Sequence, residues 1–112
     1  MSASFDLIVT IVNRGVSESI LKASKEAGAE GGTVLFGRGS GIHETKTMFG
    51  IPIEPEKEIV LTVVPGAMTD KVLEAVVGAG DLDQAGSGIA FVVALKRVAG
   101  ICHLFKGILT CD

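Results

Sequence analysis

The hydrophobic residues of this chain gather in four short runs that are rich in valine and isoleucine. The runs are Phe5–Val12, Thr33–Phe36, Glu58–Val64 and Ile89–Leu95. β-Branched residues favour extended backbone, and the near absence of alternation is typical of strands that are covered on both faces. We therefore predict four β-strands whose two faces are both apolar.

Between the first two runs, apolar residues recur at the spacing of a helix from about Glu18 to Ala27. Ser17 is the expected N-cap, with Ser19 as an alternative, because a hydroxyl can accept hydrogen bonds from the first turn. Gly28 stands where a C′ glycine ends many helices. The buried stripe of this helix is expected to comprise Ile20, Leu21, Ala23, Ser24 and Ala27.

Between the last two runs, a second helix is predicted to open at Thr69 or Ala67 and to close at Gly78–Gly80. The order is then β-α-β-loop-β-α-β, which is the ferredoxin-like α+β arrangement. Right-handed crossovers give one antiparallel sheet in which the strands lie in the order fourth, first, third, second, with both helices on one face. The second apolar face stays uncovered, which predicts association with other copies of the chain.

The segment between the second and third strands has the composition of a functional loop. Every second residue of Gly37–Gly41 is glycine, and Arg38 places a cation in this turn. Backbone N–H groups in such a turn can form a concave anion site, and arginine suits phosphate or carboxylate. Ile42–Lys57 then spans about 16 residues without a clear period, longer than most loops of compact domains. The plain alternative is a flexible hairpin loop with a glycine-rich entry.

Composition and charge exclude several classes of function. The formal net charge is −3 and the basic residues are scattered, so nucleic acid is not the expected partner. No apolar stretch is long enough for membrane insertion, and the N-terminal residues lack a secretory pattern, so we expect a cytoplasmic protein. His43 and His103 stand alone and no nucleophile–base set is present, so neither a metal site nor catalysis is expected. Residues 1–112 are expected to form a single domain.

In the order and spacing of these motifs, the chain resembles the PII signal-transduction superfamily, and its PII-like branch more than the nitrogen regulators themselves. Thr33-Val34 matches the nucleotide-contacting start of the second strand, and Gly39-Ser40-Gly41 matches the base of the family's T-loop. Gly86-Ser87-Gly88, with Phe91 just beyond, matches its B-loop. The likeness extends over about residues 5–100.

The resemblance implies a homotrimer with its sheets facing inward and an adenine nucleotide in the clefts between subunits. It also implies that the T-loop, Ile42–Lys57, regulates a partner such as a membrane transporter. The B-loop is residues 82–88, and residues 96–112 form a C-terminal tail. Within this tail, Val98–Phe105 is expected to be either a short strand or a turn of helix. By resemblance, the nucleotide-binding residues are Thr33, Arg38, Gly39, Ser40, Gly41, Gly86, Ser87 and Gly88.

Departures from the family pattern refine the expected ligand. The chain has no tyrosine, which excludes uridylylation, and Ile89 stands where PII B-loops carry a lysine. A site with fewer cations loses the most affinity for the ligand with the most negative charge, which is a triphosphate. ADP or AMP is therefore expected in preference to ATP. The possible counter-charges are Arg38, Lys57, Lys96 and Arg97.

Apolar residues within the T-loop are expected to form a partner-docking surface, made of Met48, Phe49, Ile51 and Ile53. We also expect this loop to be mobile in the absence of ligand or partner. Cys102 and Cys111 are either two unrelated thiols or a redox-sensitive pair, and the sequence leaves both open. The alternative to a nucleotide-binding regulator is a trimeric scaffold or metal-tolerance protein of the CutA type, which has no nucleotide site.

Overall fold

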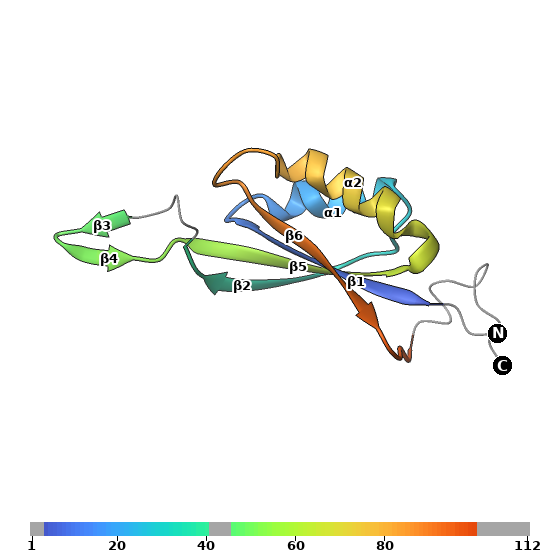
Figure 1. Cartoon of the computed structure of the whole chain (residues 1–112). Helices are drawn as coiled ribbons and strands as arrows, with labels where there is room; N and C mark the ends of the chain where they lie inside the picture. Colours follow the sequence, from blue (N-terminus) through green and yellow to red (C-terminus); the bar gives the residue numbers. More distant parts are fainter. Residues whose placement is uncertain (1–3, 41–45, 101–112) are drawn as a thin grey trace.

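The computed structural model of the chain describes residues 4–40 and 46–100, and it leaves the side chains of 46–48 and 52–53 undescribed. Predictions for Gly41, His43, Cys102, Cys111 and the rest of the tail beyond Gly100 therefore lie outside the described residues. The elements, in chain order, are β1 (Phe5–Asn13), α1 (Ser17–Glu26), β2 (Thr33–Arg38), β3 (Lys46–Met48), β4 (Ile51–Ile53), β5 (Glu56–Pro65), the 3-10 helix η1 (Gly66–Met68), α2 (Thr69–Gly80) and β6 (Gly88–Leu95) (Figure 1).

The main sheet has four strands in the order β2-β5-β1-β6, and every neighbouring pair is antiparallel. Both helices lie over the same face of this sheet (Figure 1). The four strands are those that the hydrophobic runs predict, and their order is the predicted one. The ferredoxin-like fold is therefore confirmed, because two βαβ units of the same hand interleave in this way.

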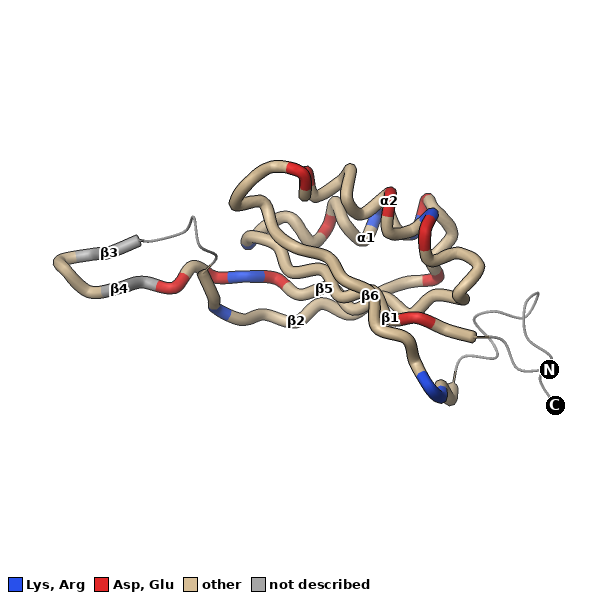
Figure 2. The backbone as a smooth tube through the Cα atoms, in the orientation of Figure 1, with Lys and Arg blue, Asp and Glu red and all other residues tan. Residues whose placement is uncertain are grey.

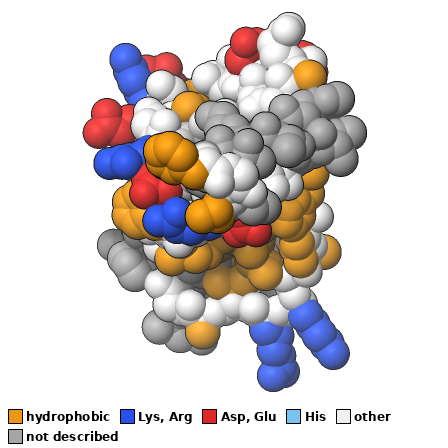
Figure 3. Space-filling model, turned by 90° about the vertical axis from the view of Figure 1, so that its left-hand side faces the viewer, with side chains coloured by type: hydrophobic (Ala, Val, Ile, Leu, Met, Phe, Trp, Pro, Cys, Tyr) orange, Lys and Arg blue, Asp and Glu red, His pale blue; other side chains and the backbone are white. Residues whose placement is uncertain are grey.

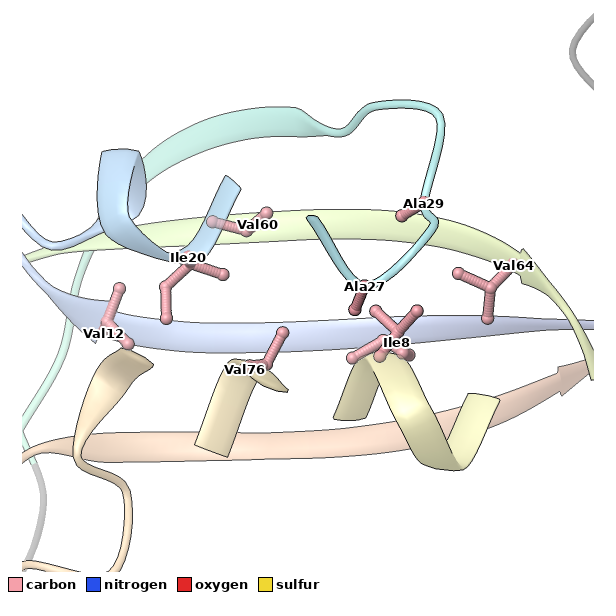
Figure 4. Packing of buried hydrophobic residues seen from close by; sticks show 9 residues of the cluster. Ile8, Val12, Ile20, Ala27, Ala29, Val60, Val64 and Val76 are labelled. Carbon is pink, nitrogen blue, oxygen red and sulfur yellow. The ribbon is translucent and has the colours of Figure 1, made fainter. Parts of the chain in front are cut away.

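The core lies between the helices and one face of the sheet. Side chains of β1 and β5 point toward those of α1 and α2 in Figure 4, and Ile8, Val60 and Ile20 are fully buried. Even-numbered residues of β1 and β5 provide the sheet side of this core, as expected when alternate residues share a face. The buried hydrophobic cluster is Ile8, Val12, Ile20, Ala27, Ala29, Val60, Val64, Val72 and Val76.

The other face of the sheet is apolar as well, and no described element covers it. Phe91 on β6 pairs with Val9, and Val9 pairs on its other side with Leu61. Figure 3 looks onto the end that carries β3 and β4, and hydrophobic side chains gather there on the side away from the helices. We call this surface the open face; it comprises Leu7, Val9, Ile11, Leu35, Ile59, Leu61, Val63, Ile89, Phe91 and Val93.

Part of the predicted T-loop is a second, two-stranded sheet formed by β3 and β4. Its turn holds Phe49 at φ 53° and Gly50 at φ 79°, the left-handed pair that joins strands in tight hairpins. The hairpin projects away from the main sheet (Figure 1). The last two residues of the predicted loop, Glu56 and Lys57, are the first residues of β5.

Beyond β6, residues 96–100 form neither a strand nor a helix. The predicted strand or helical turn that begins at Val98 is therefore absent as far as Gly100. Within the described part of the chain, no helix has the length and apolarity needed to cross a membrane.

Candidate functional site

One end of the main sheet carries an open hollow with charged walls. It lies where β2 ends and β5 begins, beside the turn between β1 and α1. Acidic and basic residues follow one another at the start of β5, next to the basic end of β2 (Figure 2). The hollow has a volume of about 470 Å³ and is lined by Arg14, Phe36, Gly37, Arg38, Glu56 and Lys57. Three basic residues and one acidic residue give it a formal charge of +2, which favours an anionic ligand.

Glu56 is the anion of this hollow, and it faces two arginines. Its Oε2 accepts a hydrogen bond from Arg14 Nη1 at 2.8 Å, and its Oε1 lies 3.8 Å from Arg38 Nη2. Arg38 and Glu56 are directly opposite each other in the β2–β5 pairing. The two arginine side chains are largely solvent-exposed and that of Glu56 is nearly half exposed, so these ion pairs are weak and exchangeable.

A hydrogen-bonded relay connects the start of β5 to the B-loop. Lys57 Nζ donates to Asn13 Oδ1 at 2.6 Å, and Asn13 Nδ2 donates to the backbone carbonyl of Gly86 at 3.0 Å. Lys57 is buried, with 8% of its surface exposed, so its ammonium depends on such polar partners. The amide of Asn13 therefore holds the foot of the T-loop and the B-loop in a fixed relation at one end of the sheet.

Glu58, the residue after Lys57 in β5, caps helix α1 although it lies far from the helix in the sequence. Its Oε1 accepts hydrogen bonds from the backbone N–H groups of Gly15 at 3.0 Å and Ser17 at 2.9 Å. The predicted Ser17 or Ser19 cap is wrong, because the N-cap residue is Val16 and no side-chain cap hydrogen bond is made there. Hydrogen bonds from the Ser17 backbone, foremost, and from its side chain hold the pKa of Glu58 below its ordinary value.

Replacing Glu58 by glutamine is expected to lower the free energy of unfolding by about 1 kcal/mol at neutral pH, as for other lost caps. The depressed pKa means that the carboxylate stabilises the fold above its unfolded pKa. This stabilisation is lost as the pH falls through the folded pKa, so Glu58→Gln and wild type should converge in acid. Urea unfolding across that pH range measures the difference, with the exposed Glu54→Gln as control. A constant difference at all pH values would contradict a charge-dependent cap.

The two glycine segments predicted to bind phosphate lie at the same end of the sheet, on its two opposite edges. Gly37 and Arg38 end the edge strand β2, and Gly88 begins the edge strand β6. Three strand spacings separate them, about 14 Å within one protomer. Two of their N–H groups already have internal acceptors, because Gly39 N donates to Pro55 O at 3.1 Å and Ser87 N donates to Gln84 O at 3.2 Å.

Thr33 is not brought near this hollow within one protomer. It pairs with Leu61, whereas Arg38 pairs with Glu56, so it lies five residues before Arg38 in β2, about 17 Å away. Of the predicted counter-charges, Arg38 and Lys57 line the hollow. Lys96 and Arg97 follow the opposite end of β6, because Leu95 pairs with Phe5.

Sequence reasoning missed Asn13, Arg14 and Glu56 as members of the site. Asn13 and Arg14 read only as a turn, and Glu56 as part of a loop, because nothing local indicates the register that joins them. Among the described residues, no group of three or more His, Cys, Asp or Glu side chains is placed to hold a metal ion.

Comparisons with known proteins identify the family of this chain. The family model described as nitrogen regulatory protein P-II matches residues 5–102. No curated protein matches the chain.

Two solved structures share the fold. A Bacillus cereus protein related to NIF3 has a TM-score of 0.67 and 20% identity over 87% of this chain, which spans 27% of that protein. Arabidopsis thaliana PII bound to citrate has a TM-score of 0.63 and 20% identity over 84% of this chain and 77% of that one. At this identity, the structures support the fold alone. Because the family model covers most of its length, the chain belongs to the nitrogen regulatory protein P-II family.

Proposed function

We propose that this P-II family signalling protein senses an adenine nucleotide, ADP or AMP in preference to ATP, in clefts between the protomers of a homotrimer. The observation that carries the proposal is the charged hollow at the foot of the T-loop. Arg14, Arg38 and Lys57 all line it, and the relay through Asn13 ties it to the B-loop. Backbone turns beside clustered cations are a common setting for phosphate groups.

The strand order supports a cleft between protomers. The T-loop foot lies on the β2 edge and the B-loop on the β6 edge, at the same end of the sheet. In a closed ring of protomers, one such edge meets the opposite edge of the next copy, as in any head-to-tail interface. The nucleotide-binding residues proposed for the cleft, partly from each side, are Thr33, Arg38, Gly39, Ser40, Gly41, Gly86, Ser87 and Gly88.

The ligand preference follows from charge. The formal charge of +2 in the hollow includes Glu56, whose carboxylate opposes a third phosphate. A triphosphate therefore gains less electrostatic binding energy here than in a site lined by cations alone. The citrate bound by the Arabidopsis structure is also a multiply charged anion, which agrees with a site for such ligands in this fold.

The hairpin β3–β4 is the proposed output of the sensor. Phe49 is 96% exposed at its tip and Ile51 is 65% exposed beside it. Large exposed apolar side chains on a projecting hairpin suit docking on another protein, such as a membrane transporter. Met48 and Ile53 belong to the same proposed docking surface, although their side chains lie outside the description.

A trimeric CutA-type scaffold or metal-tolerance protein without a nucleotide site is the alternative function. It needs no anion-binding hollow, so the convergence of three basic residues favours the sensor. A binding measurement decides between the two.

Calorimetry with ADP, AMP and ATP tests the proposal. We expect measurable binding of ADP or AMP without hydrolysis, and Arg38→Ala should weaken it by about ten- to a hundredfold, since a charge-assisted contact is lost. Lys22→Ala, which removes an exposed charge on α1, is the control and should bind as wild type does. Absence of binding at millimolar concentration for all three nucleotides would refute the sensor and leave the scaffold.

A further inference from the structure

Glu56 occupies the position that a ligand anion would take between the two arginines of the hollow. Its two carboxylate oxygens face different guanidinium groups, Oε2 toward Arg14 at 2.8 Å and Oε1 toward Arg38 at 3.8 Å. A phosphoryl group presents two oxygens to a pair of arginines in a similar manner. The protein thus supplies its own anion to this site.

We propose that Glu56 is an internal counter-anion, and that a phosphoryl group of the ligand displaces its carboxylate from Arg14 and Arg38. This inference rests on the proposed function, and it identifies Glu56 as a residue that controls the affinity of the site for its ligand. Glu56 is then a residue that opposes binding, in contrast to the cations around it.

The energetics allow this exchange. The side chains of Arg14 and Arg38 are 75% and 64% exposed and that of Glu56 is 46% exposed, so water screens both pairs. Exposed ion pairs of this kind contribute at most about 1 kcal/mol. A phosphoryl group carries about twice the charge of a carboxylate and binds arginine through two oxygens, so it can replace Glu56, whereas a monocarboxylate gains nothing over it.

The position of Glu56 couples this exchange to the T-loop. Arg38 is the last residue of β2 and Glu56 the first of β5, and they face each other across the two feet of the loop. The next contact along the loop is the hydrogen bond from Gly39 N to Pro55 O at 3.1 Å. Displacing Glu56 therefore removes the side-chain tie at the feet while the buried core of the sheet stays as it is.

Glu56→Gln tests this in the chain of residues 1–112, because it keeps the side-chain shape and removes the charge. With pyrophosphate as the probe, calorimetry should show that Glu56→Gln binds it about tenfold more tightly than wild type does. The reason is that the variant lacks the carboxylate that competes with pyrophosphate for the two arginines. Glu54→Gln is the matched control: it makes the same charge change two residues earlier, at an exposed position outside the hollow. It should alter the affinity less than twofold.

A second measurement reports on the mechanism directly. Arginine side-chain NMR signals of Arg14 and Arg38 should shift on pyrophosphate addition to wild type, and Glu56→Gln alone should reproduce part of that shift. Hydrogen exchange in the β3–β4 hairpin should rise in Glu56→Gln and in pyrophosphate-bound wild type, because the tie at the loop feet is lost in both.

The outcomes separate this inference from the proposed function. The displacement is refuted if Glu56→Gln does not bind pyrophosphate, or binds it with the affinity of wild type. It is also refuted if the increase in affinity is no larger than that of Glu54→Gln. ADP binding that depends on Arg38 would in that case leave the sensor intact. Tighter pyrophosphate binding by Glu56→Gln with no nucleotide bound by either protein would support the displacement and refute the nucleotide sensor.

Discussion

Gly88→Ala is expected to destabilise the protein more than any other glycine substitution at the candidate site. Gly88 has φ +142°, and a Cβ there would lie 2.4 Å from the backbone oxygen of Ile11 and 3.1 Å from Val12 Cγ1. Ile11 belongs to the central strand β1, so this clash can be relieved only by separating β1 from β6. Backbone strain and overpacking together cost about 2–5 kcal/mol.

Two other glycines provide matched controls for this substitution in urea unfolding. Gly86 has φ +83° with no atom within 4 Å of an added Cβ, so Gly86→Ala should cost only the backbone strain, about 1 kcal/mol. Gly39 lies in open space without a positive φ, so Gly39→Ala should be close to neutral. Equal losses for Gly88→Ala and Gly86→Ala would contradict the clash with Ile11.

This geometry changes the interpretation of Gly88. Gly88 is one of the predicted nucleotide-binding residues, but the structure shows that a side chain there would first disrupt strand pairing. Loss of ligand binding in Gly88→Ala is therefore no evidence of a phosphate contact. Gly86→Ala is the better probe of the B-loop, because its added methyl group touches no neighbouring atom.

The strands and their order were predictable because their signals are local. Runs such as Phe5–Val12 and Glu58–Val64 are rich in β-branched residues, and the handedness of βαβ units leaves few ways to order them. The helix stripe was predictable for the same reason, since Ile20 and Ser24 recur at helical spacing and are buried. The three-residue strands β3 and β4 were missed, because segments that short carry no measurable period.

The contacts of the site were not predictable, because they join residues far apart in the sequence. Asn13 reaches Gly86 across 73 positions, and Arg14 reaches Glu56 across 42. Each depends on the register of β1 against its neighbours, which a single sequence does not specify. For the same reason Ser17 looked like a cap, although the acceptor that caps α1 is Glu58, 41 positions away.

The open face leads to the second large effect, which concerns assembly. Wild type is expected to be a homotrimer at micromolar concentration, because no described element of one protomer covers the apolar residues of this face. Phe91 is 43% exposed and stands beside Val9 near the middle of the face. A carboxylate buried there without a partner costs several kcal/mol, so Phe91→Asp should give monomers.

Light scattering after size exclusion measures the assembly, and Ala67→Asp, on the exposed surface of η1, is the control that should remain trimeric. Far-UV circular dichroism checks that Phe91→Asp keeps its fold. A wild-type monomer, or a folded Phe91→Asp variant that stays trimeric, would contradict assembly through the open face.

Phe91→Asp also tests where the ligand binds. Phe91 does not line the charged hollow, so its replacement leaves Arg14, Arg38 and Lys57 in place within each protomer. If the nucleotide needs the B-loop of a neighbouring copy, the monomeric variant should lose ADP binding by at least about a hundredfold, since the contacts made by Gly86, Ser87 and Gly88 of that copy are absent. If it keeps wild-type affinity, the nucleotide is held by one protomer. The B-loop would then be connected to the nucleotide site through Asn13 of the same protomer.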